Sequence, residues 1–305
     1  ISKIETATKN PRIKKKQPAR TRDGEKVHLY VTVYSTEDAT LGLQYGAGGI
    51  GLFRMEQIYL QSSQLPTKEE LSAHMDSIFR HMPEKSIIVR LLDTGGDKIL
   101  PYIPMPDEEN PFLGLRGVRF LLKRKDILRT QIRAVLDLMK KYRLEVLVPM
   151  VSIAEEMREI RALFKEERKK RDGLARKKIR LGSMIEMPGA VFNIGEIARE
   201  SDFFSIGTND LIQYTMAAGR ENASVEEYFE YGIKPVLKLI KRINTTAVKH
   251  GIRAYVCGEL AGDKRYVESM LKAGIRHFSV SAYAVPELRK LIRTLTISPS
   301  RKIKR

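Results

Sequence analysis

Phe203-Phe204-Ser205-Ile206-Gly207-Thr208-Asn209-Asp210 is a short apolar run that ends in a glycine and then presents an amide beside a carboxylate. Such a run is typical of a buried strand that ends at a functional edge. An earlier run, Ile185-Glu186-Met187-Pro188, also ends in a carboxylate, about one strand-helix repeat upstream. Parallel strands of an α/β fold end at the same edge, so the two carboxylates are expected to lie close together.

Apolar, β-rich runs of this kind occur eight times, and helical patterns separate them. The expected strands are Val27–Val33, Gly49–Met55, Ser86–Asp93, Leu144–Val151, Ile179–Glu186, Phe203–Asp210, Arg253–Glu259 and His277–Ala282. The expected helices are Thr36–Tyr45, Lys68–His81, Asp126–Tyr142, Ala154–Lys170, Gly189–Arg199, Val236–His250, Asp263–Ala273 and Pro286–Thr294. Strands that alternate with helices indicate a parallel sheet.

Eight apolar runs without a polar edge strand favour a closed sheet over an open one. We therefore predict an α/β fold, a (β/α)8 TIM barrel, with an open doubly wound sheet as the alternative. The segment Leu100–Arg116 is rich in proline and acidic residues and interrupts the repeat after the third strand. We expect it to form a loop or small hairpin on the catalytic face.

The net charge of +18 is concentrated near the N-terminus, in residues 165–180 and in residues 289–305. Without an RNA-binding signature or zinc-ligand spacing, these runs are typical of solvated helix faces, and no nucleic-acid partner is expected. No apolar run is long enough to span a membrane. One cysteine excludes an internal disulfide and fits a cytoplasmic location. We expect a basic arm (1–26), a barrel (27–296) and a basic tail (297–305), cut from a longer protein.

Polar residues at the expected strand ends define a candidate site. They comprise four arginines, two carboxylates, an amide and a thiol, namely Arg54, Arg90, Arg116, Arg220, Glu186, Asp210, Asn209 and Cys257. Arginine binds phosphate and carboxylate groups through two parallel hydrogen bonds, and carboxylates hold Mg²⁺ against the same anion. This set predicts a small phosphate ester as the ligand. The sequence has no nucleotide-binding loop.

Each of these residues also has a purely structural alternative. A strand-end arginine is often a salt-bridge partner, and Cys257 could be a packing residue. Glu186 or Asp210 could cap the helix that follows it. Asp93 and Glu259 could orient arginines. The joint placement of these residues at strand ends favours the functional interpretation.

Several motifs resemble the phosphoenolpyruvate-binding barrel of Enzyme I, the phosphoenolpyruvate–protein phosphotransferase of the bacterial sugar phosphotransferase system. They are Gly49–Glu56, Val89–Lys98, Glu108–Arg116, Ser205–Tyr214 and Cys257–Asp263. The resemblance covers about residues 27–294. Alternatives are the related barrels of pyruvate phosphate dikinase and phosphoenolpyruvate synthase, a Mg²⁺-dependent oxo-acid lyase or aldolase on the same barrel, and a non-catalytic basic binding module.

The resemblance implies Mg²⁺-dependent phosphoryl transfer from phosphoenolpyruvate to a histidine on a separate N-terminal domain, with release of pyruvate. By the same resemblance, the substrate is bound by Arg54, Arg90, Arg220 and Asn209, catalysis involves Arg116 and Cys257, and Mg²⁺ is held by Glu186 and Asp210. Cys257 would protonate the enolate carbon. The implied partners are the phosphohistidine domain, a small phosphocarrier protein and a second copy of the chain.

The sequence departs from the family pattern at several positions. The family usually has threonine where this chain has Met55, and aspartate where it has Gly219. The segment Asn222–Lys234 is unusual, and none of the five histidines lies in an acceptor motif. None of these departures removes an expected ligand of the site.

Overall fold

Eight parallel strands close into a barrel because the first strand pairs with the last. The computed structural model describes residues 17–96, 100–171, 173 and 178–297. The strands are β1 (His28–Val33), β2 (Gly49–Arg54), β3 (Ser86–Arg90), β4 (Arg143–Val148), β5 (Leu181–Ile185), β6 (Phe203–Gly207), β7 (Arg253–Cys257) and β8 (His277–Val280). Pairing of β1 with β8 confirms the predicted TIM barrel and excludes the open sheet.

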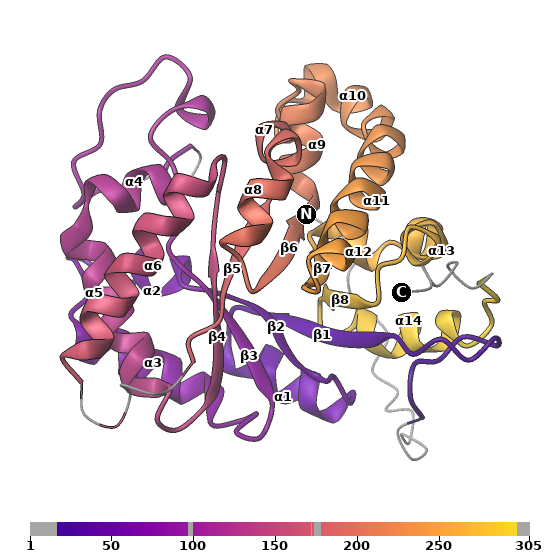
Figure 1. Ribbon diagram of the computed structural model, residues 1–305, viewed down its shortest axis with the longest axis horizontal. Coiled ribbons are helices and arrows are strands. Elements are labelled where there is room, and N and C mark those ends of the chain that lie inside the picture. The colour runs from indigo at the N-terminus through magenta and orange to yellow at the C-terminus, as the bar shows by residue number, and fades with distance from the viewer. Residues whose placement is uncertain (1–16, 97–99, 172, 174–177, 298–305) are drawn as a thin grey trace.

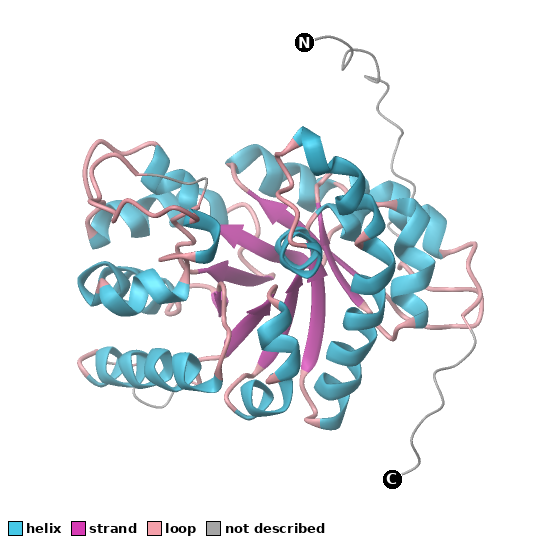
Figure 2. Ribbon diagram, turned by 90° about the horizontal axis from the view of Figure 1, so that it is seen from above, coloured by secondary structure: helices cyan, strands magenta, loops and turns pink. Residues whose placement is uncertain are grey.

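Helices surround the barrel on its outer side (Figures 1 and 2). They are α1 (Thr36–Gln44), α2 (Glu56–Leu60), α3 (Lys68–Phe79), α4 (Val118–Lys123), α5 (Lys125–Leu138), α6 (Ala154–Lys169), α7 (Pro188–Phe192), α8 (Ile194–Arg199), α9 (Thr208–Met216), α10 (Glu226–Tyr231), α11 (Ile233–Lys249), α12 (Glu259–Gly262), α13 (Lys264–Lys272) and α14 (Ala284–Ile292). Short 3₁₀ turns cover Pro111–Leu113 and Ala223–Val225. The helix expected over 189–199 is divided at Asn193 into α7 and α8.

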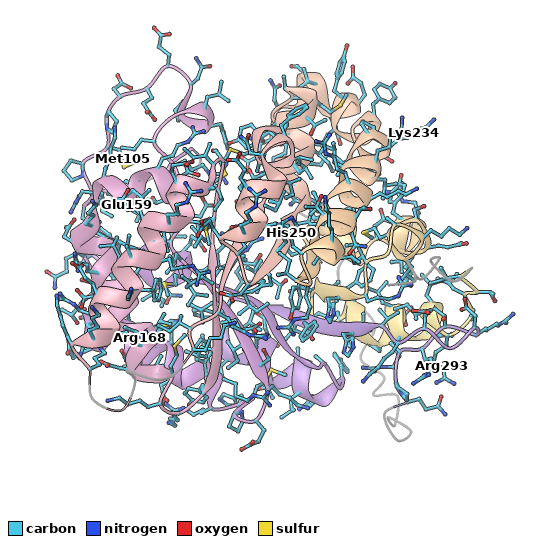
Figure 3. The ribbon with its side chains drawn as sticks, in the orientation of Figure 1. Met105, Glu159, Arg168, Lys234, His250 and Arg293 are labelled. Atoms are coloured by element: carbon cyan, nitrogen blue, oxygen red, sulfur yellow. The ribbon has the colours of Figure 1, made fainter. Side chains whose placement is uncertain are left out.

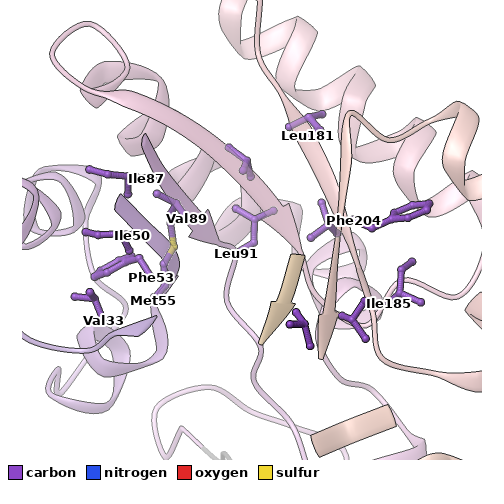
Figure 4. Packing of buried hydrophobic residues seen from close by; sticks show 14 of the residues in the cluster. Val33, Ile50, Phe53, Met55, Ile87, Val89, Leu91, Leu181, Ile185 and Phe204 are labelled. Atoms are coloured by element: carbon purple, nitrogen blue, oxygen red, sulfur yellow. The ribbon is translucent and has the colours of Figure 1, made fainter. Parts of the chain in front are cut away.

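The strands are apolar on both faces because two hydrophobic cores enclose them. Side chains that point outward, such as Ile50, Phe53 and Val89, pack against the helices (Figure 4). Inside the barrel a second cluster contains Tyr30, Leu52, Ile88, Leu147, Met184, Phe203, Tyr255 and Cys257. The barrel interior is thus a packed core, and the space for a ligand lies at its mouth.

Charged and polar side chains cover the outer faces of the helices, as Lys234 of α11 does in Figure 3. Two early helices begin with capping boxes in which a hydroxyl and a carboxylate satisfy exposed backbone N–H groups. Ser35 and Asp38 cap α1, and Thr67 and Glu70 cap α3. Local sequence signals therefore place the helices, and their apolar faces attach them to the barrel.

Several strands end earlier than the sequence predicted, and this places the site residues on the segments that follow. β6 ends at Gly207, so Asn209 and Asp210 belong to the first turn of α9. β5 ends at Ile185, directly before Glu186. The insert after β3 is the magenta loop above α4 in Figure 1. Its described residues, 100–116, form a loop with one 3₁₀ turn, and no hairpin occurs in them.

Part of the predicted arm packs against the barrel. Ala19 is buried in the outer core, and a single antiparallel bridge joins Arg20 to Lys26. Ile297, at the start of the predicted tail, is also buried, and its N–H donates to Asp23. The remainder of the predicted arm and tail, residues 1–16 and 298–305, lies outside the described residues.

Candidate active site

A cavity of about 970 Å³ opens at the C-terminal ends of the strands, and a narrow chamber of about 20 Å³ adjoins it. The chamber is lined by Arg54, Arg90, Met184, Glu186, Gly207, Thr208, Asn209, Asp210, Arg220, Cys257 and Gly258. Seven of the eight predicted site residues belong to this lining. Arg116 is not among the lining residues, although it contacts one of them.

Arg90 at the end of β3 is fixed by two carboxylates. Its Nη2 donates to Oε1 of Glu56 at 2.8 Å, and its Nη1 lies 3.4 Å from Oδ2 of Asp93. Burial alone would lower the pKa of Arg90, but the two carboxylates outweigh it and raise the pKa. The same Glu56 oxygen also accepts the backbone N–H of Asp93. Glu56 therefore orients Arg90, a role that its place in the Gly49–Glu56 motif did not reveal.

Two arginines that line the chamber each have a buried donor without a partner. The Nε atoms of Arg54 and Arg90 are buried and have no hydrogen-bond acceptor among the described residues. The guanidinium of Arg54 also lies 5.1 Å from the ring centroid of Tyr34. A buried donor without an acceptor is unfavourable, and an anion bound in the chamber would satisfy it.

Arg116 is held by two aspartates and a tyrosine. Its Nε and Nη2 donate to Asp93, both at 3.1 Å, while Nη1 and Nη2 donate to Asp210 at 2.9 and 3.2 Å. Nη1 also donates to the hydroxyl of Tyr214 at 3.2 Å. Burial would lower the pKa of Arg116, but the neighbouring carboxylates raise it. Arg116 thus remains charged and joins the insert to α9.

Glu186 is completely buried, with its two oxygens in different settings. Oε1 accepts the backbone N–H of Met150 at 2.7 Å, whereas Oε2 has no partner among the described residues. Met150 has a positive φ of 57°, which is costly for a residue other than glycine. Burial, followed by the charges of Asp210 and Asp93, raises the pKa of Glu186 to about 7.

The two carboxylates of the chamber have the chemistry that Mg²⁺ requires. Oε2 of Glu186 is unpartnered, and each oxygen of Asp210 accepts one bond from Arg116 and retains a second lone pair. No group of three His, Cys, Asp or Glu residues that could hold a metal occurs in the described part of the chain. The protein therefore offers two carboxylates, and Mg²⁺ typically completes its octahedron with water and substrate oxygens.

Cys257 ends β7 at the base of the chamber. Its Sγ donates to the carbonyl of Ile206 at 3.3 Å and lies 3.6 Å from Oγ of Ser205. Burial raises the pKa of this thiol above its usual value, against the opposing effects of Ser205 and Arg54. The thiol is therefore protonated at neutral pH and can act as a proton donor.

The amide of Asn209 is oriented by Glu259. Its Nδ2 donates to Oε1 of Glu259 at 3.1 Å, and its Oδ1 accepts the Glu259 backbone N–H at 3.0 Å. Glu259 and Asp93 were both considered as residues that orient arginines. Glu259 instead orients the Asn209 amide, whereas Asp93 contacts Arg90 and Arg116. Gly258 has a φ of 90°, and a Cβ there would lie 2.3 Å from Oγ1 of Thr208.

The residues around this chamber carry the motifs on which the sequence resemblance rests, and comparison with known proteins agrees with it. Residues 8–297 match the model of the PEP-utilising enzyme, PEP-binding domain family. The chain belongs to this family. The match covers nearly the entire chain, including every predicted site residue.

Curated relatives of this PEP-binding domain are named phosphoenolpyruvate-protein phosphotransferase. The Haemophilus influenzae protein is 39% identical over 287 residues, which are 93% of this chain and 50% of the relative. The Staphylococcus carnosus protein is 39% identical over 286 residues (93% and 50%), and the Bacillus subtilis protein is 38% identical over 283 residues (92% and 50%). The chain spans about half the length of the curated relatives it matches.

These names favour the Enzyme I interpretation over the dikinase, synthase and lyase alternatives. In the described part of this PEP-binding domain, no helix combines the length and the apolar character that crossing a membrane requires.

Proposed function

We propose that this domain binds phosphoenolpyruvate at the arginine-lined chamber, with the body of the substrate in the larger cavity that adjoins it, and is the catalytic half of a phosphoenolpyruvate–protein phosphotransferase. The observation that carries the proposal is the set of buried, unpartnered polar atoms on three residues that line the chamber. They are Nε of Arg54, Nε of Arg90 and Oε2 of Glu186. The two arginine donors can hydrogen-bond an anion, and the glutamate oxygen can coordinate a cation. A phosphorylated acid bound together with a metal ion supplies both partners.

Substrate binding is assigned to the arginines and to Asn209. Arg54 and Arg90 offer their unpaired Nε–H groups to the anion, and Arg220 also lines the chamber. Guanidinium groups match both the phosphate and the carboxylate of phosphoenolpyruvate. The Asn209 amide, already oriented by Glu259, supplies a further hydrogen bond at the same mouth.

Mg²⁺ is assigned to Glu186 and Asp210. An ion held by these two carboxylates would supply positive charge to offset the charge on the substrate oxygens. Arg116 keeps Asp210 in a fixed orientation through two hydrogen bonds.

The reaction breaks the bond between phosphorus and the enol oxygen of phosphoenolpyruvate. The phosphoryl group passes to a histidine of a separate domain, and the enolate takes a proton on its methylene carbon to become pyruvate. Cys257 donates that proton from Sγ, and its thiolate regains a proton from solvent. The raised pKa of Cys257 keeps the donor protonated between turnovers.

Differential scanning calorimetry tests binding of the substrate. Phosphoenolpyruvate with Mg²⁺ should raise the melting temperature because it binds only the native state, whereas pyruvate alone should not. A melting temperature unaffected by phosphoenolpyruvate and Mg²⁺ would contradict the proposal.

Transfer of the phosphoryl group is tested with radiolabelled phosphoenolpyruvate. A phosphohistidine domain supplied in trans should become labelled. Label on a histidine of this chain would refute the proposal that the acceptor histidine lies on a separate domain.

We further propose that the chain works as a cytoplasmic homodimer and that the phosphohistidine domain passes phosphate to a small phosphocarrier protein. Exposed aromatic side chains support pairing, since Phe192 of α7 is 75% exposed and Tyr231 of α10 is 65% exposed. Light scattering at micromolar concentration with ligand present should give twice the chain mass. A monomeric mass would exclude the dimer.

A further inference from the structure

The hydroxyl of Tyr214, on α9, contacts the insert at two points. It accepts a hydrogen bond from Nη1 of Arg116 at 3.2 Å and donates to the carbonyl of Phe112 at 2.5 Å. Tyr214 follows Asp210 by four residues on α9, so both side chains lie on one face of that helix. The same hydroxyl thus contacts the insert, through Phe112, and the arginine that holds Asp210.

Arg116 has all five of its N–H donors engaged by the protein. Two donate to Asp93, two to Asp210 and one to Tyr214. The side chain is 1% exposed. Loss of the Tyr214 acceptor would therefore leave a buried charged N–H without a partner, which is unfavourable enough to shift the guanidinium.

We propose that Tyr214 is a positioning residue that acts on the chamber through Arg116. With every donor engaged and no place in the chamber lining, Arg116 fixes Asp210 and does not bind the substrate directly. This inference rests on the proposed function and reassigns Arg116 within it. Arg116 was expected, by the family resemblance, to be a catalytic residue, and no feature of the sequence indicates its five hydrogen bonds.

The same contacts couple the insert to the chamber. The Phe112 ring lies 5.8 Å from the Arg116 guanidinium, and the Phe112 carbonyl receives the Tyr214 hydroxyl. A displacement of the 3₁₀ turn at Pro111–Leu113 would therefore move Tyr214, then Arg116 and then Asp210. Tyr214 transmits the position of the insert to the carboxylate assigned to the metal.

Tyr214→Phe tests the proposal because it removes the hydroxyl and keeps the ring. Tyr102→Phe is the matched control. Tyr102 also ties the insert to the barrel, through its hydroxyl on the carbonyl of Tyr59 at 2.5 Å. Its hydroxyl makes no contact with Arg116. If anchoring of the insert alone matters, both variants should behave alike.

Three measurements separate the outcomes. With the phosphohistidine domain present, Tyr214→Phe should lower kcat/KM for phosphoenolpyruvate by about tenfold or more, the size expected for one bond to a charged group. Phosphoenolpyruvate affinity should change by less than about twofold, because the arginines of the chamber are unaltered. NMR exchange of the Arg116 guanidinium protons should accelerate in Tyr214→Phe and remain slow in Tyr102→Phe.

Equal turnover in the two variants, or unchanged Arg116 proton exchange in Tyr214→Phe, would overturn the inference. A double-mutant cycle adds a second check, because Tyr214→Phe should have little further effect in an Arg116→Lys background. Failure of the wild-type chain to bind phosphoenolpyruvate would instead refute the proposed function. The NMR result still decides whether Tyr214 positions Arg116.

Discussion

Gly207 lies so close to Glu186 that a Cβ atom on it would be 2.5 Å from Oε2 of the carboxylate. Gly207 has a φ of −84°, which alanine readily adopts, so the glycine is required by the neighbouring carboxylate and not by the backbone. The missing side chain at Gly207, the last residue of β6, therefore provides the space that the buried Glu186 carboxylate occupies.

Gly207→Ala should displace Glu186 and lower the free energy of unfolding by about 1–3 kcal/mol, the usual cost of overpacking. Mg²⁺ affinity in the presence of phosphoenolpyruvate should fall with it. Denaturant unfolding and titration calorimetry measure the two effects. Gly195→Ala is the control, because a Cβ at that helical position meets nothing within 4 Å and alanine favours the helix. Equal stability of the two variants would contradict the steric argument.

The raised pKa of Glu186 predicts a particular pH dependence in metal-free protein. The unfolded carboxyl loses its proton near pH 4.5, whereas the folded one retains it to about pH 7. Between these values the native state binds more protons, so stability should fall as pH rises. Glu186→Gln should flatten this part of the stability curve, as followed by thermal unfolding at several pH values. An unchanged slope would show that another group is responsible.

Mg²⁺ binding should show the opposite trend, because the ion requires the ionised carboxylate. Below pH 7, where Glu186 holds its proton, affinity should fall by roughly tenfold per pH unit. The ion should bind weakly alone and more tightly with phosphoenolpyruvate, since the protein supplies two carboxylates. Calorimetry with and without substrate measures the difference, and Asp210→Ala should abolish it. Equal affinity in both conditions would argue against shared coordination.

Cys257→Ala separates the proton donor from a packing residue. Phosphoenolpyruvate affinity should stay near the wild-type value, because the proposed anion contacts are made by the arginines and not by the thiol. Pyruvate formation with the phosphohistidine domain present should fall by about 10²–10⁴-fold, the usual contribution of a general acid. A coupled pyruvate assay measures the rate. Full pyruvate production by the alanine variant would make the thiol structural.

The strand pair that closes the barrel should be sensitive to acid. His277 of β8 lies opposite His28 of β1, and their rings stack with centroids 4.8 Å apart. Burial, with the charges of His28 and Arg253, lowers the pKa of His277 to about 3. Below about pH 6.5 the unfolded chain gains a proton that the native state does not, so stability should fall as pH decreases.

His277→Phe retains a stacked ring without the titrating nitrogen. Its stability should decline less steeply between about pH 6.5 and pH 3 than that of the wild type, by up to about 1.4 kcal/mol per pH unit. Chemical unfolding at a series of acidic pH values provides the comparison. Parallel curves for the two proteins would exclude His277 as the source of the acid sensitivity.

Sequence by itself determined the repeating unit and the residues at the strand ends. The alternation of apolar runs with amphipathic stretches is local, because each strand or helix carries its own periodicity and its own caps. Glu186 and Cys257 could therefore be predicted as site residues from the sequence alone, because each directly follows or ends an apolar run. The residues at which the strands end could not be predicted as closely. Thr208 and Asn209, for example, belong to the first turn of α9 and not to β6.

Only the tertiary structure decided which charged groups meet. Closure of the barrel depends on the β1–β8 register, which no single segment encodes. Arg116 reaches its five acceptors only when the insert, the end of β3 and α9 come together. Burial then makes each unpaired donor or acceptor costly, so folding selects the partners among groups distant in sequence. The polar residues near the strand ends could thus be predicted from the sequence, whereas the ion-pair network that orders them exists only in the closed barrel.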